Sequence, residues 1–147
     1  MRQILVRSIE VDADVSKAWE HLIEPARWPS WAKHIKRVEM EPQGRVRIGS
    51  KGRVRLRNGT SARQQVVEIN ELRNWRWDGR FLGMRLIYDH AFGPTPSGGT
   101  RITFTVDADG PGVGTIGRLF GRLYARNLAR SLPNLEAELA DSGHNGG

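Results

Sequence analysis

The pattern of apolar and polar residues changes several times along the chain. Residues 3–11 alternate in the manner of a strand, and the next stretch has the spacing of a short helix. Asp12 or Asp14 can cap this helix, because a side-chain oxygen there can accept a hydrogen bond from a free N–H group of the first turn. Pro25 ends the helix, and the segment after it leaves room for at most one more short helix. The predicted apolar face of the first helix consists of Val15, Ala18, Trp19 and Leu22.

Six further strands are predicted between this helical region and the C-terminal part of the chain. Residues that favour turns separate several of them, and Asn58-Gly59 is a strong signal for a two-residue hairpin. Strands that follow one another through short loops favour an antiparallel sheet. The predicted strands cover residues 33–41, 45–57, 61–71, 73–82, 84–93 and 99–107.

The C-terminal part of the chain has the spacing of one long helix. Glycines and a proline at 110–114 precede it, and Pro133 is expected to kink or break it near its end. Its apolar positions are Ile116, Leu119, Phe120, Leu123, Leu128, Leu132, Leu135 and Leu139. Strands followed by such a helix predict an α+β fold, in which a curved antiparallel sheet wraps around a rod about 38 Å long. A gap between the sheet and the rod would form a pocket.

Length and composition place the chain among ordinary single domains. Its 147 residues suit one domain, predicted to cover residues 1–142, with a frayed tail at 143–147. No cysteine is present, which excludes a disulfide framework, a thiolate metal site and a cysteine nucleophile. The first residues do not form a signal peptide, and no apolar run is long enough for a membrane span. We therefore expect a soluble cytoplasmic protein.

Common catalytic and cofactor motifs are missing from the sequence. Its four histidines lack metal-binding spacing such as HExxH. Neither a GxSxG nucleophile motif nor a phosphate-binding glycine loop with its lysine occurs. The glycines at 110–114 are more typical of a turn into the following helix. No metal and no cofactor are predicted.

Three segments resemble a known family. They are VDADVSKAWEHLIEPARWPSWAKHIKRVEM at 11–40, GGTRITFTV at 98–106 and GPGVGTIGRLFGRLYARNLARSLPNLEAEL at 110–139. Together they resemble the START-like, or SRPBCC, superfamily, and most closely its polyketide cyclase/dehydrase-type branch. This resemblance covers almost the whole chain.

The resemblance implies a helix-grip fold. In this fold a seven-stranded curved antiparallel sheet wraps around a long C-terminal helix, and two short helices follow the first strand. Known members include cyclases as well as lipid and hormone carriers, so the fold does not by itself define the function. The two short helices would form a V, and Trp28 and Trp31 would wedge it against the sheet. A role of these tryptophans as a ligand gate is the alternative interpretation.

The alternation of the later strands suggests which side chains face the long helix. Tyr88 and His90 fall on the same face as apolar residues, and a buried phenol and imidazole each need a partner or a ligand. Both are candidate catalytic residues, because together they could move a proton in a carbonyl compound. The alternative is that His90 is a core residue whose hydrogen bonds are satisfied. The candidate ligand-binding residues are Trp75, Trp77, Phe81, Leu86, Tyr88, His90, Phe104, Leu119, Leu123 and Asn127.

The strand predicted at 61–71 has two faces of mixed character. One face carries Arg63 and Gln65 with two aliphatic residues, and the other carries Gln64 and Val66 with Ala62 and Glu68. If the first face were inward, Arg63 would be a buried cation in need of an anionic partner. An outward Arg63 is the preferred interpretation.

The chain is strongly basic, with a formal net charge of +7 and a pI of about 10.7. Partners of opposite charge would be an acidic protein, an anionic membrane surface or nucleic acid. No helix-turn-helix or RNA-recognition signature supports nucleic acid. The candidate surface arginines are Arg118, Arg122, Arg126 and Arg130 on the long helix and Arg53, Arg55 and Arg57 in the strand at 45–57.

Three functions remain open from the sequence. The first is binding of a hydrophobic small molecule of polyketide, lipid or isoprenoid type between the sheet and the long helix. The second is a cyclase or dehydrase that uses Tyr88 and His90. The third is a basic module that binds an acidic macromolecule through its arginines.

Overall fold

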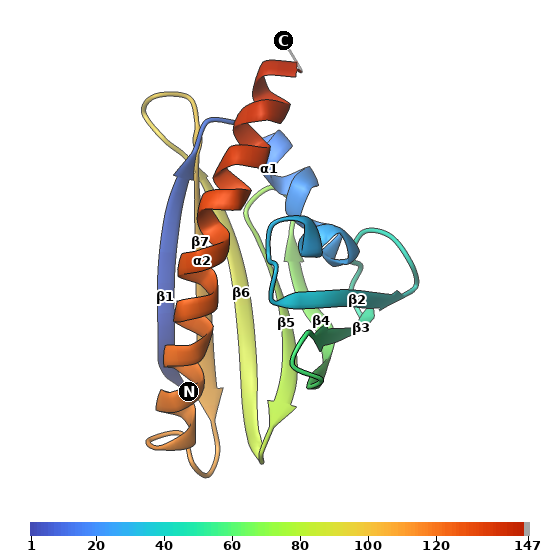
Figure 1. The fold of residues 1–147 in the computed structure, drawn as a ribbon, viewed down its shortest axis with the longest axis vertical. Helices are drawn as coiled ribbons and strands as arrows, with labels where there is room; N and C mark the ends of the chain where they lie inside the picture. The colour runs from blue at the N-terminus through green and yellow to red at the C-terminus, as the bar shows by residue number, and fades with distance from the viewer. Residues whose placement is uncertain (146–147) are drawn as a thin grey trace.

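The computed structural model describes residues 1–145, with side chains through Ala140. Its strands bend around one long helix, as the helix-grip prediction requires (Figure 1). The elements are β1 (Arg2–Val11), α1 (Val15–Leu22), the 3-10 helix η1 (Pro25–Ser30), β2 (Ile35–Glu41), β3 (Lys51–Leu56), β4 (Ser61–Asn70), β5 (Asn74–Phe81), β6 (Met84–Pro94), β7 (Thr100–Asp109) and α2 (Ile116–Asn145). The frayed tail predicted at 143–147 extends beyond the described residues and stays a prediction.

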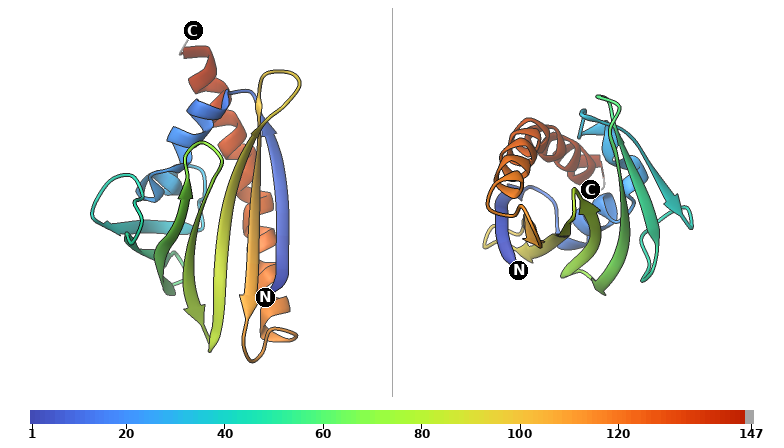
Figure 2. Two further views of the ribbon diagram at one scale, coloured as in Figure 1. Left: turned by 180° about the vertical axis from the view of Figure 1, so that it is seen from behind. Right: turned by 90° about the horizontal axis from the view of Figure 1, so that it is seen from below.

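The sheet has the strand order β1-β7-β6-β5-β4-β3-β2, and every neighbouring pair is antiparallel. From β2 to β7, strands that follow one another in the chain are neighbours in the sheet, and β1 pairs with β7. The two edge strands are therefore β1 and β2. Seen from below, the sheet is a curved wall, and α2 lies across its open side (Figure 2). Among the described residues, no helix is both long and apolar enough to cross a membrane.

Local signals place several elements where the sequence predicts them. Asp14 caps α1 by accepting a hydrogen bond from the Lys17 amide at 2.8 Å. The predicted hairpin at Asn58-Gly59 joins β3 to β4, but its loop is longer than the predicted two residues, because the Leu56 amide donates to the Thr60 carbonyl. Gly59 has a φ of +93° that glycine adopts without strain. A two-residue turn, Leu82-Gly83, joins β5 to β6, and both of its residues have positive φ.

The strand predicted at 45–57 is wrong in its first half. Residues 45–50 form a loop, and β3 begins only at Lys51. In this loop the Ser50 hydroxyl accepts a hydrogen bond from the Arg47 amide, which closes a tight turn. The Val46 amide donates to the Ile23 carbonyl at 2.9 Å, which fastens the loop to the end of α1. Val46 is buried, but Ile48 is 65 % exposed.

The long helix buries a different face in each of its halves. Leu128, Leu132, Leu135 and Leu139 are buried, as predicted, and Pro133 does not end the helix. Leu119 and Leu123, both predicted to line the interior, are 58 % and 53 % exposed. The reason is a close contact with β1: a Cβ on Gly121 would lie 2.7 Å from the Ile4 carbonyl oxygen. In this half, the face of α2 that carries Gly121 is therefore turned toward the sheet, and Leu119 and Leu123 are turned away from it.

Candidate functional site

One end of the interior is filled by an aromatic cluster around His90. The His90 ring stacks on Trp75 at 4.1 Å, with an interplanar angle of 19°. Trp28, from η1, covers it at 5.5 Å, and Phe104 meets it edge-on at 5.9 Å. Trp77 completes the cluster at 5.3 Å from Trp75. We call this region, with α1, η1 and the second half of α2, the closed end of the molecule.

The strand register brings these rings together. β5 alternates inward tryptophans with outward polar residues, and β6 pairs with it so that Trp75 lies opposite His90 and Trp77 opposite Tyr88. Trp77 also needs space on its other side. Gly52 of β3 supplies it, since a Cβ there would lie 2.9 Å from the Trp77 ring.

Trp28 and Trp31 join the short helices to the rest of the closed end. Both are buried, and Trp28 packs on the rings of Trp75 and Trp77 at 6.0 and 5.5 Å. The Trp28 indole N–H donates to the Leu22 carbonyl, and the Trp31 carbonyl accepts from the Asn134 amide of α2. These contacts support the predicted wedge.

His90 is a neutral core residue in this structure. Its Nδ1–H donates to the Trp75 carbonyl oxygen at 3.2 Å, since a carbonyl can only accept. Burial lowers the pKa of His90 to about 4, although the Trp75 carbonyl and the charge of Asp89 act in the opposite direction. A histidine with such a pKa is a weak base at neutral pH.

A second group of rings lies toward the other end of the interior. Tyr88 of β6 contacts Phe120 and Tyr124 of α2 at 6.4 and 5.8 Å, and Phe120 contacts Phe81 of β5 at 5.4 Å. Burial raises the pKa of Tyr88 to about 12, while a hydrogen bond from the Gln64 side chain partly opposes this shift. Burial also raises the pKa of Tyr124. We call these rings, with the first half of α2 and the β5–β6 turn, the open end.

Four buried polar atoms have no hydrogen-bond partner among the described residues. They are Oε1 of Gln64 and the indole nitrogens of Trp19, Trp31 and Trp75. Buried polar groups are normally paired, so each of these atoms is a place where a ligand or a water molecule could bond. The sequence prediction omits Gln64. Gln64 shares a strand face with buried Val66, and this alternation could have indicated that Gln64 points inward. A bulge between Val66 and Glu68 interrupts the alternation, so the pattern of the whole strand does not show which face is inward.

The predicted site residues fall into three groups. Six are buried on the inner face of the sheet: Trp75, Trp77, Leu86, Tyr88, His90 and Phe104. Phe81 lies at the rim with 39 % exposure, and Asn127 is half-buried on α2. Leu119 and Leu123 are on the outer face of α2, so the structure contradicts their predicted place in a pocket.

The two candidate catalytic residues belong to different ring clusters. Tyr88 contacts Phe120 and Tyr124, whereas His90 contacts Trp28, Trp75, Trp77 and Phe104. No hydrogen bond between Tyr88 and His90 occurs in the described part of the chain. A proton relay between this phenol and this imidazole therefore has no direct geometric support.

The two arginine groups predicted as surface sites differ in their surroundings. In the β3 group, Arg55 pairs with Glu39 and Arg57 donates to the Lys33 carbonyl at 2.7 Å. On α2, Arg118, Arg122, Arg126 and Arg130 are exposed, and none forms an ion pair with a described carboxylate. Outward Arg63 is exposed as well, in agreement with the preferred interpretation.

Fold and interior together define a helix-grip protein with an aromatic inner face. The profile of the family described as "Polyketide cyclase / dehydrase and lipid transport" matches residues 2–140. The chain belongs to this family. A search of curated proteins found no match.

Solved structures with the same fold are distant in sequence. The di-domain ARO/CYC StfQ from the steffimycin biosynthetic pathway superposes with a TM-score of 0.72 at 19 % identity, covering 96 % of this chain and 52 % of that one. A protein from Mesorhizobium loti gives 0.71 at 14 % identity, with coverage of 94 % and 96 %. Major latex-like protein 151 from Panax ginseng gives 0.66 at 14 % identity, with coverage of 91 % and 95 %. At such identities the likeness concerns the fold alone.

Proposed function

We propose that the chain binds a hydrophobic small molecule of polyketide, lipid or isoprenoid type at its open end, between the first half of α2 and strands β4 to β6. The closed end is already occupied by the indole rings around His90, so it offers little room for a ligand. Family membership supports a role of this class.

The observation that carries the proposal is a continuous aromatic path from the surface to the interior. Phe81 is 39 % exposed and contacts Phe120 at 5.4 Å. Phe120 stacks on Tyr124 at 5.9 Å, and Tyr124 contacts buried Tyr88 at 5.8 Å. Ligand sites are lined mainly by apolar and aromatic side chains with a few polar groups. An apolar ligand entering along this path would exchange water for aromatic contacts.

Two polar groups at the inner end of the path would orient the ligand. The Gln64 side chain lies against Tyr88, and its Oε1 is buried without a partner. A ligand hydroxyl could donate to this oxygen, and pairing it would remove the penalty of a buried unsatisfied acceptor. Tyr88 stays protonated at neutral pH, so its hydroxyl could donate to a ligand carbonyl.

A cyclase or dehydrase activity is the second candidate, and the protonated Tyr88 is what favours it. Its phenol could polarise a substrate carbonyl by hydrogen bonding. His90 is a weak base and contacts a different set of rings, so this reading lacks the base that proton abstraction needs. Tyr88→Phe distinguishes the candidates: a binding protein should lose only several-fold in affinity for a carbonyl-bearing ligand, whereas an enzyme should lose turnover of a substrate that still binds.

Native mass spectrometry of freshly purified protein is the direct test for a bound molecule. Organic extraction and identification of what is released would then give its chemical class. A stoichiometric hydrophobic passenger is the expected result. A protein that carries nothing and takes up no neutral apolar probe would contradict the proposal.

A pair of matched variants tests the location of the site. Phe120→Asp introduces a carboxylate into the aromatic path, and Val67→Asp introduces the same group on the outer face of β4, where Val67 is 43 % exposed. Binding of the neutral fluorophore N-phenyl-1-naphthylamine should weaken at least about tenfold in the first variant, since burying a charge is strongly unfavourable. Val67→Asp should bind as the unmodified protein does. Equal affinities in both variants would exclude the proposed path.

A further inference from the structure

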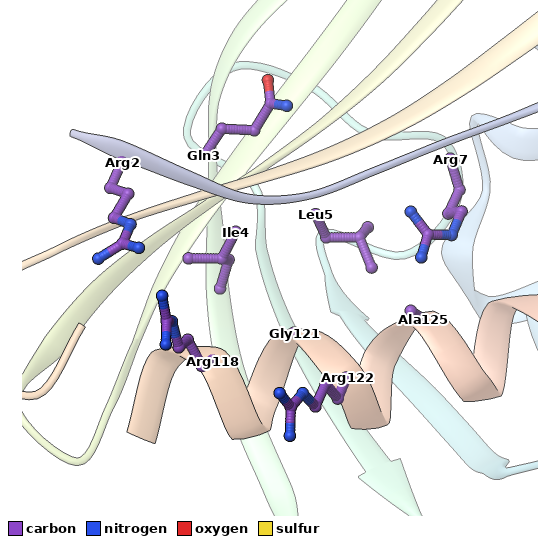
Figure 3. Close-up of a pocket in the computed structure, with 9 residues that line it drawn as sticks. All are labelled: Arg2, Gln3, Ile4, Leu5, Arg7, Arg118, Gly121, Arg122 and Ala125. Carbon is purple, nitrogen blue, oxygen red and sulfur yellow. The ribbon is translucent and has the colours of Figure 1, made fainter. Parts of the chain in front are cut away.

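A groove of about 310 Å³ lies outside the proposed ligand path, between edge strand β1 and the first half of α2 (Figure 3). Four arginines line it: Arg2 and Arg7 come from β1, and Arg118 and Arg122 come from α2. Ile4 and Ala125 give it apolar walls. Four arginines along one groove make it cationic, which favours an anionic partner.

An irregularity in β1 turns its two arginines toward the helix. The register of β1 against β7 shifts between Gln3 and Leu5, so residues on both sides of the shift face α2. In Figure 3, Arg2, Leu5 and Arg7 point toward the helix, and Gln3 points away from it. Arg118 and Arg122 lie one helical turn apart on α2, and both are exposed; in Figure 3 the Arg118 side chain reaches toward the strand, while the Arg122 side chain runs along the helix.

Among the side chains that the structure describes, residues 1–140, none of the four groove arginines forms an ion pair. Arg7 donates to the Val6 carbonyl, which leaves its charge uncompensated. Residues 110–135 contain no acidic residue, and Arg118 lies in the first turn of α2, where the helix dipole disfavours a cation. An anion in the groove would offset the repulsion among the arginines and the unfavourable interaction of Arg118 with the helix dipole.

Exposed apolar side chains gather next to the groove. Of the ten large apolar side chains that are exposed among residues 1–140, five lie at this end of the molecule: Phe81 at 39 %, Leu82 at 67 %, Ile116 at 38 %, Leu119 at 58 % and Leu123 at 53 %. We call these five residues the apolar tip. The β5–β6 turn and the connection from β7 to α2 lie together at the lower end of Figure 1.

Contacts at the apolar tip join the β5–β6 turn to α2 and to the connection that precedes it. Phe81 packs on Phe120 of α2, and a Cβ on Gly83 would lie 3.9 Å from the Pro111 ring. Leu82 is exposed in a left-handed conformation, with a φ of +49° that disfavours an ordinary side chain. A concentrated exposed apolar surface of this kind marks an interaction site.

We propose that the arginine groove and the apolar tip together bind the surface of an anionic phospholipid bilayer. Phosphate head groups would accept hydrogen bonds from the groove arginines, and Leu82, Leu119 and Leu123 would enter the boundary between head groups and acyl chains. Arginines beside exposed leucines on one helix are typical of interfacial membrane binding. Nucleic acid offers phosphates but no apolar phase for the leucines. This inference shares Phe81 with the proposed ligand path, but it does not require a ligand to be bound.

Co-sedimentation of the full chain with vesicles tests the inference. The protein should bind vesicles of phosphatidylcholine mixed with phosphatidylglycerol and should not bind pure phosphatidylcholine. Added salt should weaken the binding, because the attraction is partly electrostatic. Arg118→Gln with Arg122→Gln should weaken it about thirtyfold, since each arginine near an anionic surface contributes roughly a factor of five.

Two further double variants make the test specific. Arg53→Gln with Arg55→Gln removes the same charge from β3, and it should bind vesicles nearly as the unmodified protein does. Leu119→Ser with Leu123→Ser changes exposed side chains and should also lose vesicle binding. Equal losses in both arginine pairs would overturn the groove as the site. A different outcome is that the leucine variant binds vesicles as the unmodified protein does, with soluble pyrophosphate competing for the site. That result would indicate a soluble phosphate ligand and would also overturn the membrane proposal.

The fluorophore assay separates this proposal from the ligand site. Arg118→Gln with Arg122→Gln should bind N-phenyl-1-naphthylamine normally while losing vesicle binding. Failure to bind vesicles with normal fluorophore binding would refute the membrane proposal alone. Normal vesicle binding without fluorophore binding would refute the ligand site alone.

Discussion

The two halves of α2 meet the rest of the protein in different ways. In the second half, Leu128, Leu132, Leu135 and Leu139 are buried, and Glu138 bonds both His21 of α1 and Ser30 of η1. The first half approaches β1 through a glycine, while its leucines and arginines are exposed. One helix therefore belongs to two environments: a packed closed end and an open end with exposed apolar and cationic groups.

This difference indicates that the closed end holds the fold and leaves the open end free to bind. Indole rings and leucines at the closed end bury large apolar areas, which dominate stability. Binding surfaces are drawn from regions that contribute less to stability. The following predictions test that division, from the largest expected effect to the smallest.

Truncating a leucine at each end should give the largest contrast. Leu135→Ala should reduce the free energy of unfolding by about 2–5 kcal/mol, because it leaves a cavity in a fully buried site. Leu123→Ala, in the same helix but more than half exposed, should change it by less than about 0.5 kcal/mol. Urea denaturation of the two variants provides the measurement. Similar losses in both would show that the two halves of α2 are equally involved in the core.

Acid should destabilise the closed end through His90. Its pKa is lowered to about 4 in the folded protein against an ordinary value of 6.5, so between these pH values the unfolded chain binds a proton that the folded chain does not. Stability should therefore fall as pH falls from about 6.5 to 4, by a total on the order of 3 kcal/mol from this group.

His90→Gln is the variant for this test, with unfolding free energies measured by urea titration at several pH values. The variant should show a much flatter dependence above about pH 5, where carboxylates contribute little. Retention of the full slope by His90→Gln would assign the pH dependence to other groups.

A pair of glycine substitutions tests how the open half of α2 is seated. Gly121→Ala should destabilise by about 1–3 kcal/mol, because its Cβ would lie 2.7 Å from the Ile4 carbonyl oxygen and force a backbone shift. Gly117→Ala meets only ordinary contacts, the nearest at 3.5 Å, and should gain up to about 1 kcal/mol from helix propensity. Thermal or urea unfolding would reveal these opposite signs. The same sign for both would contradict the close approach to β1.

Tyr88→Phe should have the smallest effect on stability, less than about 1 kcal/mol, because it removes only the hydroxyl and keeps the ring. The affinity for a carbonyl-bearing apolar ligand should fall several-fold, and that for a pure hydrocarbon probe should not. Isothermal titration with the two ligands measures the difference. Equal effects on both ligands would argue against a hydrogen bond from Tyr88 to the ligand.

Local signals explain why most of the fold could be predicted from the sequence. Asp14 and the alternation of β5 act through neighbours a few residues away, and each formed the predicted structure. Asn58-Gly59 formed the predicted hairpin between β3 and β4, with a loop longer than two residues. The loop at 45–50 was mispredicted because a tertiary bond from Val46 to Ile23 and a turn at Ser50 decide its path. Its alternation of arginine and aliphatic residues resembles a strand without being one.

The site was harder to predict because it depends on helix rotation and strand register. Leu119 and Leu123 continue the spacing of the buried leucines, but the contact of Gly121 with β1 rotates them outward. Gln64 was omitted because a bulge in β4 hides which face is inward. Burial and orientation of Tyr88 and His90 followed from alternation, yet their separation into two clusters depends on which helices cover them.

Amide hydrogen exchange with and without saturating N-phenyl-1-naphthylamine tests most directly whether the open end is the ligand site. The ligand should slow exchange in the first half of α2 and in β5 and β6 near the Leu82-Gly83 turn. Exchange in α1, η1 and the second half of α2 should be unchanged. Protection confined to the closed end, or no protection at all, would contradict the account.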